Sequence, residues 1–242
     1  MLRFVFMVAA YAAVISSAGA IVGGSAGEHG AQQHTVFLTS RVQDCSGTLI
    51  TRDLVITAAH CVASGGSFSM TTSAGSIAVT QVVIHPAFRR DTYETHKPSP
   101  DVAILKLASP APRHLRPARL ATDKAFPPRG TSFVLAGFGE SVEGDRRIGT
   151  FRTVQLSNAG TTGGIMLRLT PSGGARTAGS CTGDSGGSAY RSENNVLVLY
   201  GVIAWAGGRP GSNCGVVTGI VLIANQIEWI RATAKRLGSS LD

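Results

Sequence analysis

CTGDSGG, residues 181–187, sets one serine among three glycines. Because glycine has no Cβ, the backbone around Ser185 can turn tightly and leave the serine hydroxyl and the nearby amides open to a substrate. A serine hydroxyl is a poor nucleophile unless a base lies within hydrogen-bond reach. The segment therefore predicts a nucleophilic serine whose base must come from elsewhere in the chain.

Two other segments carry the groups that such a serine needs. ITAAHC, residues 56–61, ends a strand-like run with His60. An imidazole can accept the serine proton near neutral pH when a buried acid fixes its tautomer and stabilises its cation. DVAILKL, residues 101–107, begins an apolar strand with the lone carboxylate of Asp101, which needs a partner because an unpaired buried charge is costly. Together the segments offer a nucleophile, a base and an acid.

The fold class follows from short strand-like runs that are rich in Val, Ile, Leu or Thr. Turns rich in Gly, Pro, Ser or Asn separate them at fairly regular spacing. The runs span residues 35–38, 47–51, 54–57, 77–84, 102–107, 132–136 and 196–204. This pattern predicts an all-β protein of sandwich or barrel type, and the sequence contains no evident internal repeat.

Only the C-terminal end has a helical pattern. Its apolar positions fall on one helical face, and Gly238 follows as a stop signal; these positions are Ile223, Ile227, Ile230, Ala234 and Leu237. We expect this helix to pack on the body of the protein. The alternative is a membrane-surface role, suggested by the basic residues Arg231, Lys235 and Arg236.

Residues 1–20 are typical of a secretory signal peptide. Arg3 supplies a positive charge, residues 4–15 form an unbroken apolar run, and Ala18 and Ala20 are small residues ahead of a cleavage point. The alternative is a transmembrane anchor, but the run is shorter than the ~20 residues that a helix needs to span a bilayer. We therefore expect a secreted protein, extracellular or periplasmic, with no stable membrane span, that begins at Ile21.

Export gives the cysteines a meaning. The chain has four of them, Cys45, Cys61, Cys181 and Cys214, and none forms a C-x-x-C pair with metal-ligand spacing. We expect two disulfides. Of the three pairings that four cysteines allow, the local one joins Cys45 to Cys61 and Cys181 to Cys214.

The composition excludes several classes of protein. With 43% hydrophobic and 15% charged residues the chain is globular, neither disordered nor fibrous. A formal net charge of +8 indicates anionic surroundings, such as a polysaccharide, an acidic protein or a membrane surface, and names no partner. There is no phosphate loop, Rossmann fingerprint or nucleic-acid module, so we expect no nucleic-acid partner.

These motifs, with Ile21-Val22-Gly23-Gly24 ahead of them, resemble the chymotrypsin-like (trypsin-fold) serine peptidases. The resemblance runs in that family's order through the mature chain to the helix after Trp229. It implies two antiparallel Greek-key β-barrels with a C-terminal α-helix and a catalytic cleft between the barrels. We expect a signal peptide at 1–20, an N-terminal barrel half at 21–125, and a C-terminal barrel half with the helix at 126–242.

The same resemblance assigns roles to individual residues. His60 is the general base and then the general acid, Asp101 orients it, and Ser185 is the nucleophile. The backbone N–H groups of Gly183 and Ser185 form the oxyanion hole. Ala204 stands where the family usually has a serine that hydrogen-bonds the aspartate, so the surroundings of Asp101 differ here.

Activation and specificity are also implied by the resemblance. The amine of Ile21 would pair with Asp184 once the chain is cut, and the small residues before Ile21 make signal peptidase the expected agent. The substrate-binding positions are Gly179, Ser180, Ala204, Trp205 and Ala206. Because Gly179 carries no charge, we expect the protein to prefer substrates with a medium apolar or aromatic residue on the acyl side of the cleaved bond. The alternative is an acidic residue held by Arg209.

No metal or cofactor is expected. Between Asp53 and Asp91 there is no acidic residue, so the carboxylate-bearing calcium loop of some family members cannot form there. The other histidines lack zinc-site spacing. The sequence thus predicts a monomeric serine endopeptidase with protein or peptide substrates and protein inhibitors as partners. The alternative is a catalytically weak, cationic binding protein on the same fold.

Overall fold

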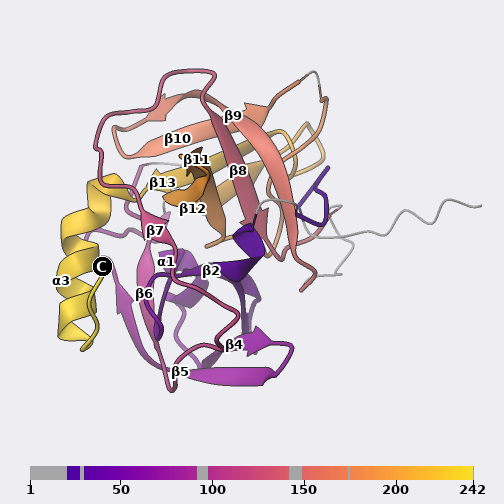
Figure 1. Ribbon diagram of the computed structural model, residues 1–242. Helices are drawn as coiled ribbons and strands as arrows, with labels where there is room; N and C mark the ends of the chain where they lie inside the picture. The colour runs from indigo at the N-terminus through magenta and orange to yellow at the C-terminus, as the bar shows by residue number, and fades with distance from the viewer. Residues whose placement is uncertain (1–20, 28–29, 92–97, 142–148, 174, 242) are drawn as a thin grey trace, which may run out of the picture.

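The computed structural model describes residues 21–27, 30–91, 98–141, 149–173 and 175–241 (Figure 1). The predicted signal peptide, residues 1–20, lies outside the described residues. Within them the chain is mostly β-sheet, arranged as two barrels with a C-terminal helix at one side. The predicted fold class is therefore confirmed.

Six described strands close into the first barrel in the order β1-β2-β3-β6-β5-β4, with every neighbouring pair antiparallel. Closure removes the open sheet edges that would otherwise need covering. All residues of β2 and β3 are buried. The strands are β1 (Thr35–Ser40), β2 (Cys45–Leu49), β3 (Leu54–Thr57), β4 (Phe68–Thr72), β5 (Gly75–Ile84) and β6 (Ala103–Leu107).

The second barrel repeats this order. Its described strands run β8-β9-β10-β13-β12-β11, and pairing of β11 with β8 closes the ring. The two-residue strand β7 (Arg119–Leu120) adds to β12 in parallel. The barrel strands are β8 (Ser132–Gly137), β9 (Arg152–Thr162), β10 (Met166–Pro171), β11 (Ser188–Glu193), β12 (Val196–Gly207) and β13 (Val217–Leu222).

Four short or terminal helical elements complete the described chain: η1 (Ala31–Gln33), α1 (Ala59–Val62), η2 (Ala224–Gln226) and α3 (Ile227–Arg236). The predicted apolar face of α3 is buried at Ile227, Ile230 and Ala234. After α3, Leu237 accepts a hydrogen bond through its carbonyl oxygen from Lys106 Nζ of β6, at 3.0 Å. The C-terminal helix therefore ties back to the first barrel, as Figure 1 shows.

The disulfides adopt the local pairing, Cys45 with Cys61 and Cys181 with Cys214. Each one lies next to a segment with a predicted catalytic residue, since His60 precedes Cys61 and the serine segment begins at Cys181. No helix in the described part of the chain has the length and apolar character needed to cross a bilayer.

Candidate active site

Strand pairing brings His60 and Asp101 together. In the antiparallel β3–β6 pair Thr57 is opposite Ala103, so residues just after β3 and just before β6 meet at one end of the barrel. His60 Nδ1 lies 2.6 Å from Asp101 Oδ2, and the His60 backbone N–H donates to Asp101 Oδ1 at 2.9 Å. With Nδ1 donating, the neutral ring carries its acceptor lone pair on Nε2.

The two side chains of this contact differ in their exposure to solvent. Asp101 is 1% exposed, whereas the His60 side chain keeps 14% of its surface accessible. The carboxylate is thus shielded from solvent, whereas the imidazole remains partly accessible. Ala204, buried in β12, provides a methyl group and no hydroxyl at the position where the family usually has a serine.

The Ser185 segment is held in a tight turn between the disulfide at Cys181 and strand β11. Asp184 N–H donates to the Cys181 carbonyl at 3.1 Å, and Gly187 N–H donates to the Asp184 carbonyl at 2.9 Å. Gly183 has φ +88° and Gly186 φ +80°, values that favour glycine. A Cβ on Gly186 would lie 2.0 Å from Thr57 Oγ1, so this glycine is also required by space.

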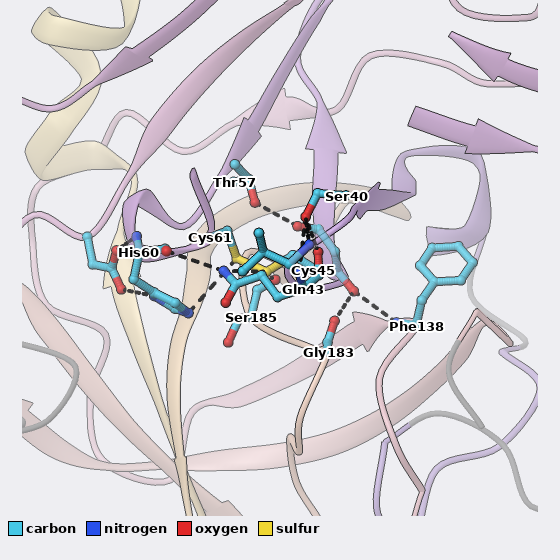
Figure 2. Close-up of a disulfide and its surroundings, with 12 residues drawn as sticks. Ser40, Gln43, Cys45, Thr57, His60, Cys61, Phe138, Gly183 and Ser185 are labelled. Atoms are coloured by element: carbon cyan, nitrogen blue, oxygen red, sulfur yellow. Dashed lines mark hydrogen bonds and ion pairs between the residues drawn. A yellow bond between two sulfur atoms is a disulfide. The ribbon is translucent and has the colours of Figure 1, made fainter. Parts of the chain in front are cut away.

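Both barrels anchor the turn. Ser46 N–H of β2 donates to the Ser185 carbonyl at 2.8 Å, and Gly186 N–H donates to the Ile203 carbonyl of β12 at 2.7 Å. Cys61 Sγ lies 3.7 Å from the same Ser185 oxygen. Figure 2 shows His60, Gly183 and Ser185 grouped around the disulfide that contains Cys61.

His60, Gly183 and Ser185 line one open hollow of about 290 Å³. Asp44 and Arg90, which the sequence analysis did not single out, also contribute to its wall. Burial raises the pKa of the Asp44 carboxyl, while a backbone hydrogen bond from Ser40 opposes that shift. The structure therefore brings His60, Gly183 and Ser185 to a shared solvent-facing site.

Asp184 lies beneath this site and is fully buried. Its Oδ1 accepts from Gly139 N–H at 2.8 Å, and its Oδ2 accepts from Cys181 N–H at 2.9 Å. Burial, with a contribution from the negative charge of Glu140, raises the pKa of Asp184 to about 7 in spite of these two bonds. Among the described residues no lysine, arginine or histidine forms an ion pair with it.

Ile21, the first described residue, is buried against the second barrel. Ile21 is 1% exposed, and Val22 and Gly179 exchange backbone hydrogen bonds of 3.0 Å. The φ angle of Ile21 is +62°, which is an outlier for a β-branched residue.

The expected substrate-binding residues surround a group that the sequence analysis missed, Thr218. Thr218 pairs with Ala206 across β12 and β13, so their side chains share one face of the sheet. Thr218 Oγ1 lies 2.8 Å from Ser180 Oγ, accepts from Ser180 N–H at 3.0 Å, and would be 3.2 Å from a Cβ on Gly179. No local sequence motif marks Thr218, because it reaches this site only through the pairing of β13 with β12.

Trp205 and Arg209 are the other two residues that the sequence analysis considered for substrate binding. Trp205 packs so closely on Gly219 that a Cβ there would lie 2.0 Å from the indole Nε1. The residue considered for acidic substrates, Arg209, is exposed and donates from Nη2 to the Arg176 carbonyl at 3.2 Å.

A protein-family model described as Trypsin matches residues 21–230. This chain belongs to the trypsin family. The match starts at Ile21 and extends into α3, so it covers both barrels and every strand described above. Within the trypsin family the chain is a serine protease by homology, at modest sequence identity to characterised members.

Three relatives illustrate that similarity. Serine protease SP24D of Anopheles gambiae is 28% identical over 229 residues, which cover 89% of this chain and 82% of that protein. Trypsin-1 of Salmo salar is 27% identical over an alignment of 253 positions, covering 96% of this chain and 98% of that protein. Trypsin-3 of Homo sapiens is 27% identical over 233 residues, covering 88% and 72%.

Proposed function

We propose that this protein is a secreted serine endopeptidase that cleaves peptide bonds through an acyl-enzyme on Ser185. The observation that carries the proposal is the doubly hydrogen-bonded His60–Asp101 pair at a hollow shared with Ser185 and Gly183. Its substrates are proteins or peptides, and protein inhibitors would occupy the same hollow. In the domain division that we propose, the N-terminal barrel half ends at residue 125 and the C-terminal half begins at residue 126.

The chemistry follows from these groups. Ser185 Oγ attacks the scissile carbonyl while His60 Nε2 takes its proton, and Asp101 stabilises the imidazolium that forms. The N–H groups of Gly183 and Ser185 stabilise the negative charge on the carbonyl oxygen. His60 then protonates the leaving amine, and the same steps with water release the acid. Neither a metal nor a cofactor is needed.

Thr218 supports a preference for small uncharged residues on the acyl side of the cleaved bond. Its hydroxyl lies against Ser180 and the Cβ position of Gly179, and it shares a sheet face with Ala206. A branched side chain there takes up volume, and no side-chain charge is present on these residues to hold a basic substrate. We therefore narrow the expected preference from medium apolar and aromatic residues towards small apolar ones.

Cleavage between Ala20 and Ile21 would both free the protein from its signal peptide and activate it. The torsion φ of Ile21 exists only while Ala20 is attached, so the cut removes an unfavourable backbone conformation. It also creates a protonated amine, a counter-charge that would stabilise the ionised form of buried Asp184. Signal peptidase would then perform export and activation in one step.

Covalent labelling tests the proposal against a cationic binding protein on the same fold. A fluorophosphonate probe should modify the processed protein at Ser185, and casein should be cleaved. Ser185→Ala is the matched control and should do neither. A correctly processed, folded protein that is unlabelled and leaves casein intact would favour the binding function.

A further inference from the structure

Ser46 makes four hydrogen bonds, two of which join the first barrel to the oxyanion segment. It is the second residue of β2 and is fully buried. Its backbone N–H donates to the Ser185 carbonyl, and its backbone carbonyl accepts from Thr57 Oγ1 at 2.7 Å. Its side chain makes the other two bonds, to Gly183 and Phe138. Ser46 is therefore hydrogen-bonded to both expected oxyanion donors.

The direction of the side-chain bonds is fixed. Phe138 N–H is a donor, so Ser46 Oγ accepts from it, at 2.9 Å. The single hydroxyl proton must then go to the Gly183 carbonyl oxygen, also at 2.9 Å. Figure 2 shows the two dashed lines that end on Gly183 and Phe138 meeting at one oxygen. The hydroxyl therefore has one orientation in this buried setting.

Gly183 needs such support because glycine is the residue with the greatest backbone freedom. The peptide before it is held by Glu140 N–H, which donates to the Thr182 carbonyl at 2.7 Å. In a trans peptide the N–H points opposite to the C=O, so this bond sets the direction of Gly183 N–H. The Ser46 hydroxyl holds the carbonyl side of the peptide after Gly183, and the bond from Asp184 N–H to the Cys181 carbonyl holds its other side. Both torsions of Gly183 are thereby fixed.

We infer that Ser46 is a positioning residue for the oxyanion hole, whose side-chain hydroxyl keeps the Gly183 N–H aimed at the developing oxyanion. The inference rests on the proposed peptidase function. Oxyanion donors accelerate acyl transfer because they are aligned before charge develops. A hydroxyl that restrains the donor therefore acts on the transition state more than on substrate binding.

Ser46→Ala tests the inference. We expect kcat for a peptide substrate to fall about tenfold or more with KM within about twofold, less than the loss of a direct oxyanion donor. The affinity for a peptide boronate, which places an oxygen in the oxyanion hole, should fall by a similar factor. Titration of the active sites with the fluorophosphonate gives the concentration of competent enzyme, and each rate is divided by that concentration.

Thr48→Val is the matched control. Thr48 is also a buried residue of β2, and its hydroxyl bonds across the barrels to Ser188 Oγ at 2.6 Å. This variant loses a comparable cross-barrel bond but should keep kcat and boronate affinity. An equal kcat loss in Thr48→Val and Ser46→Ala would assign Ser46 to general packing and overturn the inference.

The remaining outcomes are also decisive. Ser46→Ala with wild-type kcat and boronate affinity would overturn the positioning role and leave the peptidase function standing. A wild-type protein without turnover or labelling would overturn both. If Ser46→Ala does not fold, Ser46→Gly removes the same hydroxyl with less volume and carries the same expectation. Failure of both to fold, while Thr48→Val folds, would assign Ser46 to the fold alone.

Discussion

The hydroxyl oxygens of Thr218 and Ser180 lie 2.8 Å apart, and Thr218 Oγ1 also accepts from the Ser180 backbone N–H at 3.0 Å. Both residues are fully buried. These bonds lock the threonine side chain beside Gly179, at the position expected to receive the substrate side chain. We therefore expect this single residue of β13 to limit the size of the substrate side chain.

Thr218→Gly should widen this preference. Removing the side chain frees space beside Gly179 and Ala206, and a better-filled apolar site is worth about tenfold or more in kcat/KM for a larger substrate. We expect the ratio of kcat/KM for Phe over Ala substrates to rise by at least that factor. Thr218→Val keeps the volume, so its ratio should stay near that of the wild type. A dominant preference for Arg or Lys in the wild type would contradict the proposed specificity.

Ser185→Ala and His60→Ala should each abolish peptide hydrolysis. Members of a cooperating triad give non-additive losses, so each single change should cost about 10⁴-fold or more in kcat. Ser185 is held through its backbone carbonyl, which alanine preserves, so the melting temperature of that variant should stay within a few degrees of the wild type. Near-normal turnover in either variant would rule out the mechanism.

One or two extra residues before Ile21 should leave the protein folded and nearly inactive. The extension removes the free amine that we propose as the partner of Asp184. Peptide turnover and fluorophosphonate labelling would measure the loss, with the protein that starts at Ile21 as reference. Full activity of the extended form, or an exported protein that starts elsewhere by N-terminal sequencing, would refute activation by signal peptidase.

The extended form should also lose stability as pH rises. Burial raises the pKa of Asp184 from its usual 3.8 to about 7. Between these values the unfolded chain releases a proton that the folded protein keeps, so the free energy of unfolding falls with rising pH. The decrease begins near pH 4, ends near pH 7 and amounts to at most about 4 kcal/mol. Urea unfolding of the extended protein carrying Ser185→Ala, repeated across this pH range, would measure the decrease.

The matching protein that starts at Ile21 is the control for this pH effect. Its protonated amine would favour the charged carboxylate of Asp184, so the decrease in stability between about pH 4 and 7 should be smaller. Equal decreases in both forms would show that the amine and Asp184 do not interact.

Lys106→Met should loosen the C-terminal segment without changing catalysis. Lys106 Nζ contacts Asp53 Oδ2, the Leu237 carbonyl and Ser239 Oγ, so the change leaves these acceptors without their cation. Hydrogen bonds to charged groups predict a loss of about 2 kcal/mol in the free energy of unfolding. The exposed Lys235→Met is the control and should have little effect. An unchanged midpoint of urea unfolding for Lys106→Met would contradict the stabilising role of Lys106.

Local sequence was sufficient to determine several features. The apolar run at Leu54–Thr57 is strand β3 with those bounds, and the run predicted at 132–136 is β8 extended by one residue. The run predicted at 47–51 is displaced, since β2 is Cys45–Leu49. Glycine around Ser185 correctly predicted a tight turn, because positive φ angles at Gly183 and Gly186 are a property of the residue itself.

Other strands gave no readable signal. β9 contains Asn158 and Gly160, which suggest a turn, yet it pairs with both β8 and β10 along its length. β11 carries serine and charged residues and is held by neighbours on two sides. Pairing overrides propensity in these strands because strand preference depends on context.

The sequence by itself determined which chemical groups are available: a serine in a glycine turn, a histidine, a carboxylate, and cysteines suited to disulfides. Only the tertiary structure decided how the strands close into two barrels of one shared order, which no sequence repeat reveals. It alone placed Ser46 against Gly183, 137 positions away, and Thr218 against Ser180, 38 positions away. Residue type and local spacing are written along the chain, whereas contacts between distant strands exist only after both barrels have closed around their buried side chains.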